Sequence, residues 1–269
     1  MGKPIIASSG KRSIFSQVDP ESTGRYSRKE EALPDTQELL AKIDHLQERL
    51  YAEGKQSLLI ILQGMDSCGK DGTIRHVFRG ISPQGCLVAS FAEPTPEEQR
   101  HDFLWRTHQK TPAKGQIGIH NRSHYEDVLV PRVHGTISRK DLEGRFEAIN
   151  QVERLLTNYG MTIVKFFLAI SKDEQRKRLQ ARIDNPRKRW KFKPSDLKER
   201  QYWDDYMEAY DEAIRLTSTK HAPWYLIPAN HEWYRNLLVA KVICQTLEKM
   251  NPQFPTATDA VDFTTLRIE

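Results

Sequence analysis

The chain has 269 residues, a net charge of +5 and a pI near 9.0. This length suits one α/β domain, because such folds commonly exceed 200 residues without dividing. No apolar run reaches the ~20 residues of a membrane-spanning helix, and residues 1–15 lack the apolar core of a secretory signal, so we expect a cytoplasmic protein without a membrane partner. Cys68, Cys86 and Cys244 include no C-x-x-C pair, which argues against a disulfide framework or a zinc site. The basic charge suits a polyanionic ligand, although a lysine-rich solvated surface would give the same balance.

Residues 1–33 are polar and basic and show no sustained periodicity. They are predicted to form an extension that lies over the surface or is partly disordered. The pattern changes at Pro34. Asp35 and Glu38 have the spacing of a capping box, and apolar residues then recur at helical spacing up to Gly54. We therefore expect an amphipathic helix that packs on a sheet.

A phosphate-binding loop follows the first predicted strand. Residues 57–63 form a short apolar run, residues 64–70 have the pattern G-x-x-x-x-G-K, and a helix continues over about 74–78. Loop amides, the lysine and the helix N-terminus all favour an anion. An accidental match in an unrelated turn is disfavoured, because strand, loop and helix occur in the required order. The predicted phosphate-binding residues are Gly64, Met65, Ser67, Cys68, Gly69, Lys70, Asp71, Gly72 and Thr73, with Arg75 and Arg79 on one face of the following helix.

Two carboxylates distinguish this loop from the usual nucleotide-binding version. Asp71 stands where a Ser or Thr would normally hold Mg²⁺, and Asp66 lies within the loop itself. Negative charge beside a bound phosphate is unfavourable unless a metal ion bridges the two. We therefore predict Mg²⁺ as cofactor, with Mn²⁺ as a possible substitute, and Asp66 and Asp71 as ligands.

The rest of the chain alternates strands with helices. Four further strands are predicted at 86–91, 116–120, 162–170 and 224–228. Helices are predicted at 94–110, 138–159, about 194–217 and 233–250. This alternation predicts right-handed parallel crossovers, and thus a three-layer α/β/α sandwich with a parallel five-stranded sheet and ligands at the strand carboxyl ends. We expect one domain over 34–252, with a lid at about 178–196 and a peripheral tail over 253–269.

Further polar residues follow the second and third strands. Because the carboxyl ends of parallel strands meet at one edge of the sheet, these residues are expected near the phosphate loop. Phe103 and Trp105 in the same region could equally serve the core. The candidates for nucleotide binding are Glu93, Asp102, Arg106, Asn121 and Arg122, and the carboxylates Glu126 and Asp127 follow the same third strand.

A basic segment lies between the fourth and fifth strands. Arg178 and Arg182 are four residues apart and share a helix face, and basic residues including Lys188 crowd the next turn. A solvated basic helix is one interpretation, but beside a phosphate loop a lid that closes over phosphates is the better one. Trp190 and Phe192 within this segment could stack on a base or pack within the lid.

At these residues the chain resembles the polyphosphate kinase 2 family, P-loop kinases related in fold to thymidylate kinase. The resemblance covers about residues 33–252 and rests on three motifs, at 64–72, 121–127 and 184–191. In that family the loop aspartates and lysine, matched here by Asp66, Lys70 and Asp71, support phosphoryl transfer with Mg²⁺. Asn121 replaces an aspartate of most subgroups, which removes one implied metal ligand and leaves Glu126 or Asp127 to compensate. Asn121 and the segment 101–106 resemble class III, whose members phosphorylate both AMP and ADP.

The resemblance implies a phosphotransferase that moves a terminal phosphoryl group from inorganic polyphosphate to AMP and ADP, giving ADP and ATP. The implied catalytic residues are Asp66, Lys70, Arg122, Arg178 and Arg182. An ATP-dependent nucleoside monophosphate kinase and a non-catalytic polyanion-binding protein are the alternatives. Relatives suggest a homotetramer, and no nucleic acid partner is expected.

Overall fold

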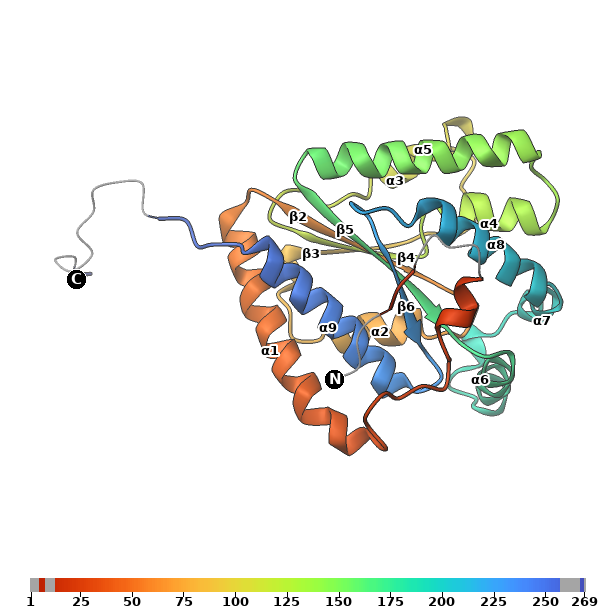
Figure 1. The fold of residues 1–269 in the computed structure, drawn as a ribbon, viewed down its shortest axis with the longest axis horizontal. Coiled ribbons are helices and arrows are strands. Elements are labelled where there is room, and N and C mark those ends of the chain that lie inside the picture. Colours follow the sequence, from red (N-terminus) through yellow and green to blue (C-terminus); the bar gives the residue numbers. More distant parts are fainter. Residues whose placement is uncertain (1–4, 8–12, 257–266, 269) are drawn as a thin grey trace.

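The computed structural model describes residues 5–7, 13–256 and 267–268, and it shows a sheet between two layers of helices (Figure 1). Helices α1 (Lys29–Glu53), α2 (Lys70–Val77) and α9 (Glu232–Met250) cover one face of the sheet. Helices α4 (Glu126–Val133), α5 (Arg139–Asn158) and α8 (Trp203–Thr217) cover the other. The predicted three-layer α/β/α sandwich is confirmed.

The sheet has six strands among the described residues, in the order β1-β6-β5-β2-β4-β3. The five predicted strands are present and pair in parallel. Their bounds are β2 Ser57–Gln63, β3 Cys86–Ser90, β4 Ile117–Asn121, β5 Met161–Ala169 and β6 Trp224–Pro228. The predicted total of five is wrong, because β1 (Ile5–Ile6) adds an antiparallel edge strand to β6. Two residues are too short a segment to show a strand period.

The core lies on both faces of the central strands. All seven residues of β2 are buried, and so are eight of the nine in β5. Strands covered by helices on both faces become continuous apolar runs. That is why 57–63 and 162–170 could be recognised from the sequence. Both strands end at the edge where the phosphate loop begins.

The N-terminal segment differs from its prediction. Helix α1 begins at Lys29 rather than Asp35 and continues through Pro34. Asp35 accepts hydrogen bonds from Arg25 and Tyr26, so its carboxylate tethers the preceding segment instead of capping the helix. In the described part of residues 1–33, Ile14, Val18 and Tyr26 are buried in the core and anchor this segment to the domain. Most of the predicted tail, over 257–266 and 269, lies outside the described residues.

Two helix predictions also need correction, and one helix was not predicted. The expected helix over 94–110 consists of two short pieces, η3 (Glu98–Arg100) and α3 (Trp105–His108). The helix expected over 194–217 is divided at Tyr202 into α7 (Pro194–Gln201) and α8. Helix α4 was not predicted, because Pro131 interrupts its pattern. No helix among the described ranges is long and apolar enough to cross a bilayer.

Candidate active site

The phosphate loop turns sharply between β2 and α2. Gly64 and Gly69 have φ angles of 144° and 101°, and Ser67 has φ 66°. A methyl group on Gly64 would lie 2.8 Å from the carbonyl oxygen of Leu168, so a side chain there would meet the neighbouring strand. These left-handed angles allow successive loop amides to face one concave surface, which suits an anion.

Lys70, the first residue of α2, lies folded against this loop. Its side chain is buried, and Nζ donates to the carbonyl oxygens of Gly64 at 2.8 Å and Met65 at 3.4 Å. The loop backbone therefore holds the ammonium group at the cavity wall. A phosphate oxygen would gain a positive charge whose position is already fixed.

Asp66 and Arg122 join the loop to the end of β4. Nη2 of Arg122 lies 2.7 Å from Oδ1 of Asp66, and Nη1 lies 4.0 Å from Glu126. Burial acts to raise the pKa of Asp66, but the charges of Lys70 and Arg122 hold it below its usual value. Burial also raises the pKa of Glu126, and there the opposing charges of Arg122 and Lys70 do not outweigh it. Asp66 is thus the more readily ionised of the two carboxyl groups.

Asp71 connects the loop to both β4 and the basic segment. Its Oδ1 accepts a hydrogen bond from Nδ2 of Asn121 at 2.8 Å, and its Oδ2 lies 3.4 Å from Nζ of Lys191. Burial acts to raise the pKa of Asp71, but these two partners lower it below its usual value. Asn121 therefore stands beside a carboxylate that is a candidate metal ligand.

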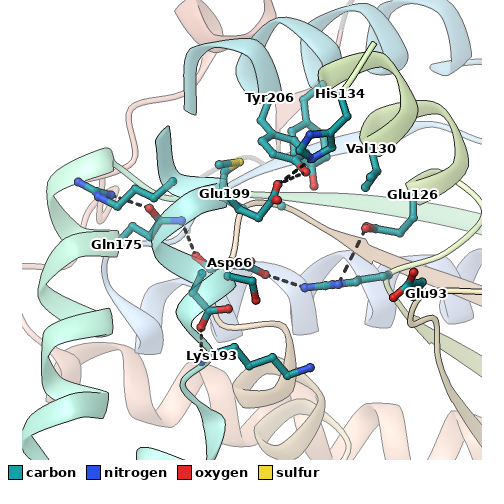
Figure 2. Close-up of a pocket in the computed structure, with 16 residues that line it drawn as sticks. Asp66, Glu93, Glu126, Val130, His134, Gln175, Lys193, Glu199 and Tyr206 are labelled. Carbon is teal, nitrogen blue, oxygen red and sulfur yellow. Dashed lines mark hydrogen bonds and ion pairs between the residues drawn. The ribbon is translucent and has the colours of Figure 1, made fainter. Parts of the chain in front are cut away.

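Two cavities meet at Asp66 and Arg122. The larger has a volume of about 920 Å³ and lies between the phosphate loop and the basic segment. The smaller, of about 340 Å³, lies between the loop and helices α4, α7 and α8 (Figure 2). Asp66, Arg122, Lys193 and Asp196 line both cavities, so a group bound in one can approach a group bound in the other across this boundary.

The two cavities differ in charge. Apart from the loop residues, the larger cavity has a basic lining that includes Arg75, Arg182, Arg187, Lys188, Lys191 and Lys193. The smaller cavity has more carboxylates than cations, with Asp66, Glu93, Glu126, Asp196 and Glu199 against Arg122, Lys193 and Arg200, and Tyr206 and Tyr210 add aromatic surface. In Figure 2, His134 and Tyr206 point toward Glu199, whose Oε2 lies 3.2 Å from Nε2 of His134 and 2.7 Å from Tyr206 Oη. The larger, basic cavity therefore suits a polyanion. The smaller cavity suits a ligand that has hydrogen-bond donors and an aromatic ring.

Comparison with known proteins identifies the family. A family model described as polyphosphate kinase 2 matches residues 26–255. The chain belongs to the polyphosphate kinase 2 family. It is 53% identical over 89% of its length to an AMP/ADP-polyphosphate phosphotransferase of Meiothermus ruber, covering 90% of that protein. It is 47% identical over 81% of its length to an ADP-polyphosphate phosphotransferase of Rhodopseudomonas palustris, covering 80% of that protein. A solved structure of polyphosphate kinase 2 from Arthrobacter aurescens is 45% identical, with a TM-score of 0.90 over 96% of this chain and 95% of that one.

The basic segment of this polyphosphate kinase 2 chain runs from the end of α6 (Lys172–Asp184) through the turn η4 (Arg189–Lys191) to the start of α7. Arg182, Arg187 and Lys188 line the larger cavity, and their side chains have no hydrogen bond or ion pair to any described residue. Trp190 is 77% exposed and lines the same cavity, so it does not pack within this segment. The basic segment therefore presents cations without ion-pair partners to the cavity.

Arg178, predicted as catalytic, is engaged differently. Its Nη1 donates to the carbonyl oxygens of Ser67 and Cys68, and its Nη2 donates to those of Ala229 and Asn230. Its guanidinium thus ties the phosphate loop to the segment after β6. Its Nη donors hold backbone and its Nε pairs with Glu174 at 2.8 Å, so in this arrangement the guanidinium is engaged by the protein itself.

Some predicted site residues lie apart from both cavities. Arg106 pairs with Asp127 at 2.8 Å and also donates to the carbonyl oxygen of Ala92, so this nucleotide candidate and this metal candidate bind each other. The carboxylate of Asp102 accepts from the Leu104 amide. The predicted residues that line neither cavity are Cys68, Thr73, Arg79, Asp102, Arg106 and Asp127.

Sequence reasoning did not find several residues that shape the site. Glu199 and Tyr206 lie within the helical region predicted over 194–217, and His134 follows the unpredicted α4, but no motif marks any of the three. Arg235 was also missed. It is a fully buried arginine in the apolar helix α9, and a charged residue on an apolar helix face was the available signal.

The carboxylates that line the larger cavity fit a metal ion that arrives with phosphate. The described residues contain no group of three or more His, Cys, Asp or Glu side chains able to hold a metal. Two loop carboxylates, Asp66 and Asp71, do line that cavity. Mg²⁺ is usually held by one or two carboxylates together with substrate phosphates and water. Kinases of this kind generally require a divalent metal, and these two aspartates suit that requirement.

Proposed function

We propose that this protein transfers a terminal phosphoryl group from inorganic polyphosphate to AMP and to ADP, giving ADP and ATP. The observation that carries the proposal is the meeting of a large basic cavity and a smaller acidic and aromatic one at Asp66 and Arg122. Phosphoryl transfer needs a donor and an acceptor aligned across one such point. The names of the relatives at 53% and 47% identity support the same reaction.

In this proposal polyphosphate occupies the larger cavity. A linear polyanion has no base to recognise, so its binding depends on positive charge along a groove. The side chains of the lid cations Arg182, Arg187 and Lys188 make no hydrogen bond or ion pair with the described residues, and they supply that charge. Lys70 and Arg122 would then stabilise the charge of the phosphoryl group in transfer.

The acceptor nucleotide occupies the smaller cavity. Glu93, Glu126 and Glu199 offer hydrogen-bond acceptors for ribose hydroxyls or an exocyclic amine, and Tyr206 and Tyr210 offer aromatic surface. Arg122 at the junction is placed to contact the acceptor phosphate. The volume of about 340 Å³ falls within the range of small-molecule sites.

The cofactor in this proposal is Mg²⁺, with Mn²⁺ as a substitute. Asp66, Asp71 and phosphate oxygens would be its ligands. The Asn121 amide lies beside Asp71, and Glu126 lies beside Arg122, so both are close to the proposed metal site. The metal ion would neutralise charge on the transferred group. The side chain of Asp127 is paired with Arg106, so it is a weaker candidate ligand than Glu126.

The proposal also covers the oligomeric state of the protein and its location in the cell. A homo-oligomer, a tetramer by resemblance, is supported by the edge strand β3, where Leu87 and Val88 are exposed. Exposed apolar edge strands are usually covered in native proteins. Light scattering coupled to size exclusion measures the oligomeric state. We place the protein in the cytoplasm, where AMP and ADP are available.

The deciding experiment supplies AMP, polyphosphate and Mg²⁺ without ATP and resolves the products by chromatography. ADP should accumulate first and ATP later. An ATP-dependent monophosphate kinase would be inactive under these conditions, and a polyanion-binding protein would turn over nothing. An adenylate kinase inhibitor and a Lys70→Ala preparation serve as controls, because contaminating adenylate kinase would also make ATP from ADP. If ADP with polyphosphate then yields no ATP, acceptance of ADP is excluded.

A further inference from the structure

A buried arginine lies directly behind the phosphate loop. Arg235 in α9 has 0% exposure, and its Nη1 donates to the carbonyl oxygen of Cys68 at 3.2 Å. A methyl group on Gly69 would lie 1.8 Å from that Nη1, and one on Gly72 would lie 3.2 Å from Nη2. The guanidinium therefore occupies the space that side chains at both glycines would fill.

Arg235 has no ion-pair partner in the described part of the chain, and the Glu232 carboxylate in the first turn of α9 acts on its charge only from a longer distance. No carboxylate there lies within the 4.0 Å of an ion pair, and its other hydrogen bonds go to the neutral amide oxygen of Asn236, at 3.2 and 3.1 Å. Burial lowers its pKa to about 10, so it remains a cation at neutral pH. A buried charge without a partner is costly, and it persists where the fold or a ligand compensates it.

We propose that Arg235 is a positioning residue for polyphosphate, holding the Cys68 carbonyl away from the cavity and adding a fixed positive charge behind the loop. Arg178 donates to the same carbonyl at 3.3 Å, so two guanidiniums fix this peptide. With its carbonyl turned toward α9, the loop presents its amides to the anion. Because Arg235 is buried, solvent ions screen its charge much less than that of the exposed lid.

The inference rests on the proposed function and is tested by Asn236→Asp. This change keeps the shape of the side chain and the acceptor atom but places a carboxylate beside Arg235. The new carboxylate should form an ion pair with Arg235 and so compensate its positive charge. Because a new ion pair replaces the existing hydrogen bonds, the fold should not be weakened. The Kd for polyphosphate, measured by calorimetry, should rise about tenfold, less than the ~10²-fold loss for a direct contact to the transition state. The KM for AMP should be unchanged, and the rise should be equally large at low and high salt.

The matched control is Asn158→Asp, which adds the same charge at an exposed position at the end of α5 and should bind as the wild type does. If the wild-type protein binds no polyphosphate, the proposed function fails. If it binds and folded Asn236→Asp binds equally well, or if salt abolishes the difference, the role of Arg235 alone is overturned. Should Asn236→Asp not fold, Arg235→Lys and Arg235→Gln decide. Arg235→Lys should keep the affinity for polyphosphate that Arg235→Gln loses. Equal affinity of the two variants overturns the proposal.

Discussion

Lys191 of the basic segment and Asp71 of the phosphate loop form an ion pair across the larger cavity, with Nζ 3.4 Å from Oδ2. The two residues are 120 positions apart in the chain, and each belongs to a different wall of the cavity. A metal ion held by Asp71 would have to compete with this ammonium group.

Lys191→Met should therefore lower the Mg²⁺ concentration that gives half-maximal activity at saturating polyphosphate. The reason is that removal of the competing cation leaves the Asp71 carboxylate free for the metal. Metal titrations of initial rate measure the effect. Lys188→Met is the control, since Lys188 lines the same cavity without contact to Asp71. An unchanged or higher Mg²⁺ requirement in Lys191→Met would contradict this role.

Lys70→Ala should reduce kcat by at least ~10²-fold, because the ammonium group meets developing charge in the transition state. Steady-state kinetics measure the loss, and a thermal melt must show an unchanged fold. Near-normal turnover by a folded variant would rule out this loop as the site of transfer.

Salt should raise the KM for polyphosphate much more than the KM for AMP. Each exposed cation that contacts phosphate releases counterions, and such contacts weaken as salt rises. Neutralising Arg187 and Lys188 together, as alanines, should flatten this dependence. Rates across a salt series with each substrate limiting test the point, and an equal response of both substrates would mean that the lid is only a solvated basic surface.

Glu126→Gln should make the protein more stable than the wild type at neutral pH but not in acid. Burial raises the pKa of Glu126 above its ordinary value of 4.5, so the folded state favours the protonated form. Below about pH 4.5 the carboxyl group is protonated in both states and contributes no difference. As pH rises through the folded-state pKa, the wild type loses stability that the amide retains. Denaturant unfolding with EDTA at several pH values should show that the difference in free energy of unfolding between Glu126→Gln and the wild type grows as pH rises. A difference that stays constant with pH would refute the raised pKa of Glu126.

Glu153→Gln should destabilise the protein by ~3–5 kcal/mol, because it leaves the fully buried Lys165 unpaired. Nζ of Lys165 lies 2.6 Å from Glu153 and 2.9 Å from the Tyr125 hydroxyl, which fixes the start of α4 beside Arg122. The double variant Lys165→Met/Glu153→Leu should recover much of the loss. Urea denaturation measures both, and a double variant as unstable as the single one would show that packing, rather than the unpaired charge, sets the cost.

The sequence alone determined the elements whose signals are local. The strand 57–63, the glycine loop and the lysine are contiguous, so their hydrogen bonds and φ requirements could be inferred without a partner segment. Helix α5 begins after Ser138 as expected, since that side chain accepts from the Asp141 amide three residues ahead. The motif resemblance likewise predicted the family before any contact was known.

The tertiary structure decided which charged side chain meets which partner. Arg106 and Asp127 both follow strands, yet packing pairs them 21 residues apart and away from the cavities, while Arg235 reaches Cys68 across 167 residues. Strand β1 exists only because β6 offers a free edge to two isoleucines. Sequence spacing fixes neighbours along one helix or strand, whereas burial and pairing depend on the surface that another segment presents.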